Sequence, residues 1–169
     1  MLAEALVLFA LPLLLAAAAG WDLASFTIPN FLQALLIAAF AAFAVATHLG
    51  AEGIGSHLLA GLIGLAVGFA LFAFGYIGGG DAKLYAAIIL WFGLKDLMSY
   101  TLVATVLGGV LTLTLLGLRN LPLPQLLARQ AWITRLHDSR AGIPYGVALA
   151  AGAFVVLPGT EIFRLAAGG

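Results

Sequence analysis

Two aspartates are the residues of this 169-residue chain best suited to chemistry. Asp22 follows Trp21 at the end of a long apolar run, and Asp81 follows three glycines in the segment FGYIGGGDAKLYAAI (74–88). Two carboxylates brought within hydrogen-bonding reach cannot both ionise easily, so one holds a proton while the other acts as a base towards a water molecule. The pair therefore suggests acid–base activation of water, the chemistry of an aspartic protease.

Each aspartate also has a simpler interpretation. Taken alone, Asp22 would be a polar residue that ends a membrane span at the interface. Asp81 would be explained equally well as the N-cap of the helix that follows it. Only the pairing of the two favours a catalytic role.

The residues around Asp81 could help a substrate to approach it. Gly78, Gly79 and Gly80 have no side chains, so an extended peptide backbone could come close. Lys83 is most simply a cation whose side chain reaches the membrane surface, although its charge could also keep one carboxylate ionised or hold a substrate group.

The composition fixes the environment in which this chemistry would occur. The chain is 64% hydrophobic and 8% charged, whereas soluble domains carry roughly 25% charged residues. We therefore expect an all-α, polytopic membrane protein. The formal net charge of zero offers nothing to attract nucleic acid. Without cysteine and with three scattered histidines, the chain shows no disulfide framework and no metal-ligand cluster, so no metal and no cofactor are expected.

About six transmembrane helices are predicted, in a single transmembrane domain over residues 1–169. The N-terminal apolar segment carries Glu4 and no basic residue, which favours a retained span over a cleaved signal peptide. The segment 84–94 is too short to span alone, and we expect it to recruit residues 81–83 and Lys95. The other uncharged runs of sufficient or nearly sufficient length are 5–21, 30–47, 58–77, 97–118 and 143–160.

The order of the spans predicts on which side the aspartates lie. Two spans separate Asp22 from Asp81, so both face the same side, and two more separate Asp81 from the polar connection 119–142. Because basic loops stay in the cytoplasm, this connection and both aspartates are predicted to be cytoplasmic. Apolar residues between its arginines allow a short interfacial helix, although a solvated connector is the simpler interpretation. The arginines of the connection are Arg119, Arg129, Arg135 and Arg140.

Small residues recur at four-residue spacing in three of the predicted helices. Such rows let helix backbones approach closely in a membrane, so we interpret them as packing surfaces without chemistry. The rows are Ala60, Gly64 and Gly68; Ala104 and Gly108; and Gly142, Gly146 and Ala150.

The motifs around the aspartates resemble those of a known family. GGGDAK (78–83) resembles the GxGD motif of intramembrane aspartic proteases, in the G-x-G-D-x-K form of the type IV prepilin peptidases. DLASFTIPNF (22–31) is similar to the segment that carries the first aspartate of that family, although the family often has basic residues where this chain has the neutral ASFT. IPYGVALAAG (143–152) resembles the short Tad/Flp-type branch.

The resemblance implies roles for particular residues. Asp22 and Asp81 would be the catalytic pair. Gly78 and Gly80 would shape the loop that admits an extended peptide, and Pro29, Asn30 and Lys83 complete the motif positions around the substrate.

The resemblance also implies a function and a location. The activity would be removal of the basic leader from a prepilin or pseudopilin at the inner face of the bacterial cytoplasmic membrane. The partners would be the membrane-anchored substrate helix and the lipid bilayer, and the oligomeric state is not indicated. Members that also N-methylate the new amino terminus carry a cytoplasmic domain with paired cysteines. This chain has no cysteine and no room for that domain, so only cleavage is expected.

Two other classes of function stay open at this point. In a small proton-coupled transporter or channel subunit, Asp81 and Lys83 near a broken helix would bind or relay an ion. A structural assembly subunit would use the small-residue rows to dock partners. Against the transporter, no predicted span has an ionisable residue at its centre.

Overall fold

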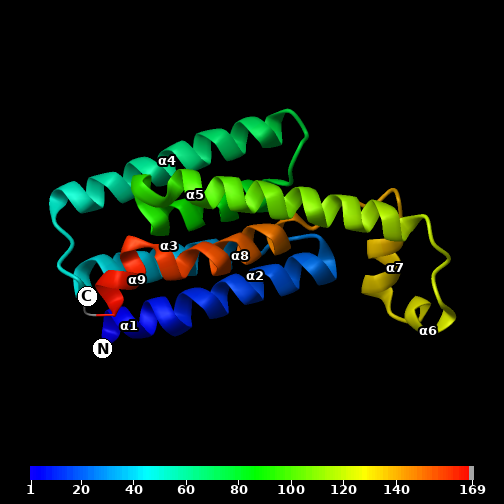
Figure 1. Ribbon diagram of the computed structural model, residues 1–169, viewed down its shortest axis with the longest axis horizontal. Coiled ribbons are helices and arrows are strands. Elements are labelled where there is room, and N and C mark those ends of the chain that lie inside the picture. The colour runs from blue at the N-terminus through cyan, green and yellow to red at the C-terminus, as the bar shows by residue number, and fades with distance from the viewer. Residues whose placement is uncertain (168–169) are drawn as a thin grey trace.

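The computed structural model describes residues 1–167, and every regular element within that range is helical. The prediction of an all-α fold is therefore confirmed. Figure 1 shows the long helices lying side by side, with both ends of the chain at the same end of the bundle. Three helices are long and apolar enough to cross a membrane, Leu2–Ser25, Ala51–Ala73 and Gly79–Arg119, and two shorter apolar helices accompany them. This arrangement is that of a multi-pass membrane protein.

The first long helix changes its winding near a proline. It comprises α1 (Leu2–Ala5), the π-helical turn η1 (Leu6–Ala10) and α2 (Leu11–Ser25). Pro12 has no N–H to offer the preceding turn, which accounts for a wider turn just before it. The helix ends where Phe26 adopts a left-handed backbone with φ 56°. Pro29 then sits at the N-cap of α3 (Asn30–Ala46).

The helix α4 (Ala51–Ala73) packs on the first half of α5 (Gly79–Arg119) through its small residues. A Cβ added to Gly64 would lie 3.2 Å from the Cα of Ala86, and one added to Gly68 would lie 2.9 Å from the carbonyl oxygen of Ala82. The predicted packing role of this row is confirmed. The helix differs from the predicted span 58–77 at both ends. It starts earlier, because polar residues before the apolar run are also helical, and it ends earlier, because Gly75 has φ 77°.

A break at Gly93 turns α5 into two segments. Gly93 has φ 70° and ψ −179°, and the ring of His57 lies 3.1 Å from where its Cβ would be. The two halves lie side by side (Figure 1), and Tyr85 of the first shares a hydrogen bond of 2.9 Å with Thr101 of the second. With this break, the chain has the six predicted helical segments. The expectation that the fourth would extend to Lys95 was wrong, because the chain turns at Gly93.

The last apolar helix, α8 (Tyr145–Val156), fits between α2 and α5. A Cβ added to Gly152 would lie 3.0 Å from the Cα of Ala104, so the predicted row on the fifth helical segment does pack closely. Gly142 was wrongly assigned to the row on α8. It precedes the helix, and no atom of the described chain lies within 4 Å of where its Cβ would be.

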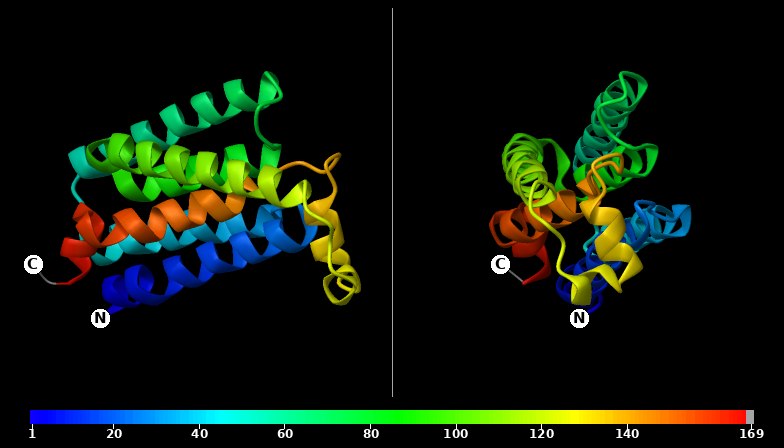
Figure 2. Two further views of the ribbon diagram at one scale, coloured as in Figure 1. Left: turned by 45° about the vertical axis from the view of Figure 1, so that its right-hand side comes forward. Right: turned by 90° about the vertical axis from the view of Figure 1, so that its right-hand side faces the viewer.

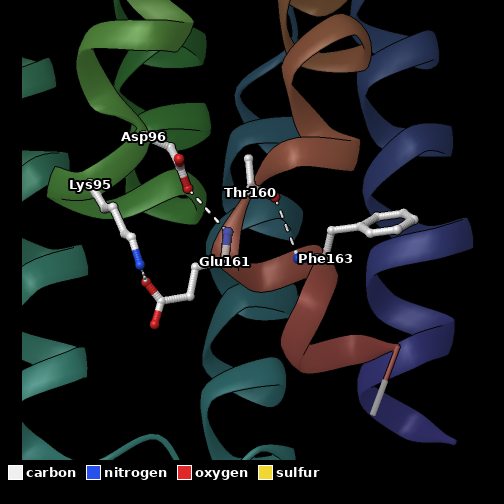
Figure 3. A network of polar contacts seen from close by, with 5 residues as sticks. All are labelled: Lys95, Asp96, Thr160, Glu161 and Phe163. Atoms are coloured by element: carbon white, nitrogen blue, oxygen red, sulfur yellow. Dashed lines mark hydrogen bonds and ion pairs between the residues drawn. The ribbon is translucent and has the colours of Figure 1, made fainter. Parts of the chain in front are cut away.

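A polar network fastens the end of the chain to the turn after Gly93. The 3₁₀ turn η2 (Leu157–Gly159) and the helix α9 (Glu161–Ala166) follow α8. Figure 3 shows Lys95 Nζ paired with Glu161 Oε2 at 3.2 Å, while the Glu161 N–H donates to Asp96 at 3.1 Å. Thr160 accepts from the Phe163 N–H and so caps α9. These charges stabilise the end of the bundle that lies away from Asp22 and Asp81.

The basic connection 119–142 crosses the opposite end of the bundle. It contains two short helices, α6 (Gln125–Ala128) and α7 (Ala131–His137), and α7 lies across the long helices in both views of Figure 2. Arg119 donates to the Leu136 and Gly142 carbonyls at 2.9 and 2.8 Å, and Arg135 donates to the Ala24 carbonyl at 3.4 Å. Hydrogen bonds thus join the connection to α5 and α2, and it lies at the end where α2 stops and α8 begins.

The close packing of α4 on α5 can be tested with two glycines of one helix. Gly68→Ala should lower the free energy of unfolding by about 1–3 kcal/mol, because the new methyl group meets the Ala82 backbone. Gly55→Ala is the matched control. No described atom lies within 4 Å of its Cβ position, so it should be neutral or stabilising by up to about 1 kcal/mol. Thermal unfolding in detergent micelles measures both, and equal melting temperatures would contradict the packing described.

Candidate active site

Asp22 lies in the last turn of α2 and is buried against α8. Its Oδ2 accepts a hydrogen bond of 2.7 Å from the backbone N–H of Gly146, in the first turn of α8. The two residues are 124 positions apart in the chain. The free N–H groups at a helix N-terminus suit a carboxylate, so the start of α8 provides a site for this side chain.

Asp81 is the third residue of α5, and its carboxylate reaches back over the start of that helix. Gly78 is the N-cap, and its N–H donates to Asp81 Oδ2 at 3.1 Å. Asp81 is therefore not the N-cap, because the helix starts two residues earlier, but its carboxylate does accept a backbone N–H at the helix N-terminus as that alternative expected. The side chain is 7% exposed, and Oδ1 is a buried atom that finds no hydrogen-bond partner within residues 1–167. One oxygen is thus held and the other is free.

A cavity of about 500 Å³ brings the two aspartates together. Asp22 and Asp81 both line it, and they are close enough for their charges to interact. Arg135 from α7 also lines this space, as does Tyr145 at the start of α8. The structure therefore assembles the predicted pair from the ends of different helices, with a cation nearby. Two carboxylates around a space of this size can hold a water molecule and a peptide group.

Glycines allow the chain to close around the carboxylates. A Cβ on Gly146 would lie 2.8 Å from Asp22 Oδ2 and 2.8 Å from Ile28 Cδ1, and one on Gly78 would lie 3.0 Å from Asp81 Oδ2. A Cβ on Gly80 would meet Ile28 at 3.3 Å. Gly78 lines the cavity, whereas Gly80 packs on the segment that follows Asp22. The space that a side chain would take at each of these glycines is filled by other residues of the protein.

The other predicted motif residues form a tether beside the site. Lys83 Nζ donates to Asn30 Oδ1 at 2.9 Å, and Asn30 follows Pro29 at the start of α3. This contact joins the first turn of α3 to the second turn of α5. Lys83 is not among the described residues that line the aspartate cavity, so its position fits a role in holding the Pro29–Asn30 segment in place.

Sequence reasoning missed three residues of this site. Gly146 was noticed only as a packing residue, Arg135 only as a basic loop residue, and Tyr145 only as part of a motif. The one local signal was the small side chain of Gly146. The contacts of all three join segments far apart in the sequence, which no spacing rule relates.

Comparison with known proteins decides the family. The model of the type IV leader peptidase family matches residues 9–113, which contain both aspartates and the GGGDAK motif. The chain belongs to this family. It is thus a member of a peptidase family, and its apolar helices are those of a membrane protein. Comparisons with curated proteins and with solved structures found no match.

The contact between Gly146 and Asp22 predicts the effect of a single methyl group. Gly146→Ala should lower peptidase activity at least about tenfold, because the methyl group would displace the Asp22 carboxylate. Gly20→Ala, on the helix that carries Asp22, is the control, since no described atom lies within 4 Å of its Cβ position. Cleavage of a leader-bearing substrate in detergent measures both variants. Full activity of Gly146→Ala would show that this contact does not position Asp22.

The tether between Lys83 and Asn30 predicts a partial and non-additive loss. Lys83→Ala and Asn30→Ala should each reduce cleavage without abolishing it, because either change frees the same segment beside the site. The double variant should be as active as the less active of the two single variants, since both changes remove the same interaction. Lys83→Arg keeps a donor and should retain more activity than Lys83→Ala. Initial cleavage rates of the four variants measure this, and additive losses would mean that the two residues act separately.

Proposed function

We propose that this chain is an aspartic endopeptidase that removes the leader from Flp-like type IV prepilins or pseudopilins at the cytoplasmic membrane face. Asp22 and Asp81 are its catalytic pair. The observation that supports this most strongly is that two buried carboxylates line one cavity, with one oxygen of Asp81 free. Membership of the leader peptidase family supports a protein substrate in a lipid environment.

The proposed reaction uses the pair as acid and base. The ionised carboxylate takes a proton from a water molecule as the water oxygen attacks the carbonyl carbon of the scissile peptide bond. The protonated carboxyl gives its proton to the carbonyl oxygen, which forms a tetrahedral diol. In the second step the first carboxyl passes its proton to the amide nitrogen, the C–N bond breaks, and the other carboxylate takes a proton from the diol. The products are a carboxyl on the leader and an amino group on the mature chain, and the pair again shares one proton.

The proposed cytoplasmic orientation rests on the distribution of charge. The basic connection and both aspartates lie at one end of the bundle, and basic connections are retained in the cytoplasm. At that level water can reach the site, which hydrolysis needs. The bacterial cytoplasmic membrane is the location that fits this substrate class.

The proposed activity is cleavage without N-methylation. The 169 residues contain no cysteine, whereas the paired-cysteine domain accompanies methylation in the family that the motifs resemble.

Removal of either proposed catalytic carboxylate should abolish processing. Asp22→Asn and Asp81→Asn keep the size of the side chain and should lower cleavage of a co-expressed Flp-type prepilin by at least about a thousandfold, because the acid–base pair is lost. Asp138→Asn is the matched control, since this carboxylate is exposed at the same end of the bundle and accepts a bond from the Arg140 N–H. Lys95→Ala at the opposite end should also behave as wild type.

Immunoblotting of the prepilin and its shorter product measures these rates. If both asparagine variants still process the leader, Asp22 and Asp81 are not the catalytic pair. Methylation of the product's new amino terminus, read by mass spectrometry, would contradict the cleavage-only part of the proposal.

A further inference from the structure

A second hollow, on the other side of Asp81, runs along the membrane-spanning helices. It has a volume of about 410 Å³ and lies between α4, the second half of α5 and α8. Its walls include Val67 and Leu71 from α4, and Thr101, Thr105 and Gly109 from α5. We call this space the lateral groove. In Figure 2, α4 leans away from the second half of α5 towards the end of the bundle where α7 lies.

We propose that the lateral groove holds the apolar membrane helix of the substrate, so that the peptide bond at its end reaches Asp81. This inference rests on the proposed function in that the occupant is the peptidase substrate. It adds the place where that substrate lies in the membrane and the residues that receive it.

The lateral groove is continuous with the cavity that holds the two aspartates. Asp81, Tyr76, Ile77 and Tyr145 line both spaces. Asp81 is 93% buried, and its Oδ1 atom has no partner among the described groups, so this atom is available to a water molecule or to a polar group of an occupant. A peptide group that leaves the end of a helix supplies such a polar group, whereas a lipid chain does not.

The wall formed by α5 suits the close approach of another helix. Thr101, Thr105 and Gly109 recur every four residues and therefore share one face of the helix. The hydroxyls of Thr101 and Thr105 donate to carbonyls of their own helix, at 2.7 Å in each case, so their donors are already used within the protein. No described atom lies within 4 Å of a Cβ placed on Gly109, so this row is not filled by the protein itself. Small-residue rows of this kind are where membrane helices pack.

The two spaces divide the substrate into two parts. Apart from the loop residues Tyr76 and Ile77, the lateral groove is lined by residues of the spans, so an occupant lies within the membrane and is apolar. The aspartate cavity opens at the end of the bundle, where Arg135 and the loop residues Gly75 and Gly142 line it. The polar leader then lies in the aspartate cavity and the apolar helix in the lateral groove, with the scissile bond between them.

The absence of cysteine allows a direct test by crosslinking. Single cysteines are introduced as Thr105→Cys and Gly109→Cys, and, as controls on another face of the same helix, as Leu102→Cys and Val106→Cys. The control residues are 59% and 63% exposed and do not line the groove. The probe is an Flp-type prepilin with one cysteine at successive positions of its apolar helix. An Asp22→Asn background keeps the probe uncleaved during oxidation.

Disulfides should form from positions 105 and 109 to one face of the probe helix, and should be at least about tenfold weaker from 102 and 106, because bonding needs Cα atoms within about 7 Å. Equal crosslinking from all four positions, or none from 105 and 109, would overturn the proposal. The wild-type chain is assayed in parallel for cleavage of the same prepilin. If it does not cleave, the proposed function fails and this inference fails with it; if it cleaves without the expected crosslinks, only the lateral groove is refuted.

A substitution that fills the lateral groove tests the proposal in a second and independent way. Gly109→Leu fits the open space on α5 and should raise the KM for the membrane-anchored prepilin about tenfold, with a smaller effect on a short peptide that carries the leader and cleavage site without the apolar helix. Val106→Leu on the lipid-facing side is the control. If Gly109→Leu cleaves the anchored prepilin with an unchanged KM, the groove does not receive the substrate helix and the proposal is wrong.

Discussion

The site depends on one constraint, that a carboxylate removed from water inside an apolar bundle must find hydrogen-bond donors. Backbone N–H groups supply them at both aspartates: Gly146 donates to Asp22, and Gly78 donates to Asp81. The first N–H groups of a helix have no partner within that helix, and each carboxylate lies at a helix N-terminus where such groups are available. The start of α8 must therefore meet the end of α2, and that meeting brings the two carboxylates to one cavity. Without the Gly146 N–H, the buried Asp22 carboxylate would lose this hydrogen bond, which costs about 1–3 kcal/mol.

Close helix packing is the second requirement, and it is met by residues without side chains. Lipid gives apolar helices no hydrophobic reason to associate, so contact area and backbone proximity must hold the bundle together. Gly68 lies against Ala82 at the start of α5, and Gly152 lies against Ala104 in its second half. The first contact fixes the helix turn that carries Asp81, and the second fixes α8, which carries Gly146. Packing in the spans thus determines the geometry at their ends.

The polar residues are separated according to their tasks. At one end, Arg119 and Arg135 hold the basic connection over the aspartate cavity. At the other end, Lys95, Asp96 and Glu161 fasten α9 to the turn after Gly93. Between these ends the walls of the lateral groove carry hydroxyls that bond to their own helix. Such a distribution leaves the free oxygen of Asp81 as a polar feature that a peptide bond entering from the membrane can meet.

The amino-acid sequence by itself determined the class of the protein, because hydropathy and helix length are local properties. The apolar runs predicted an all-α membrane bundle of about six helical segments, and the motifs around Asp22 and Asp81 predicted the family. The placement of both aspartates on one side also followed from the sequence, since each span reverses the side on which the chain emerges. Helix ends were less predictable: α4 begins before its apolar run, and the turn expected near Lys95 occurs at Gly93.

Only the tertiary structure decided which backbone groups serve the carboxylates and what lies beside them. The bond from Gly146 to Asp22 spans 124 residues, and the bond from Lys83 to Asn30 spans 53. No sequence pattern encodes such contacts, because they result from the packing of whole helices. The same holds for the lateral groove, whose walls come from α4, α5 and α8. Sequence thus supplied the reactive groups and the environment, and packing supplied the distances at which those groups can act.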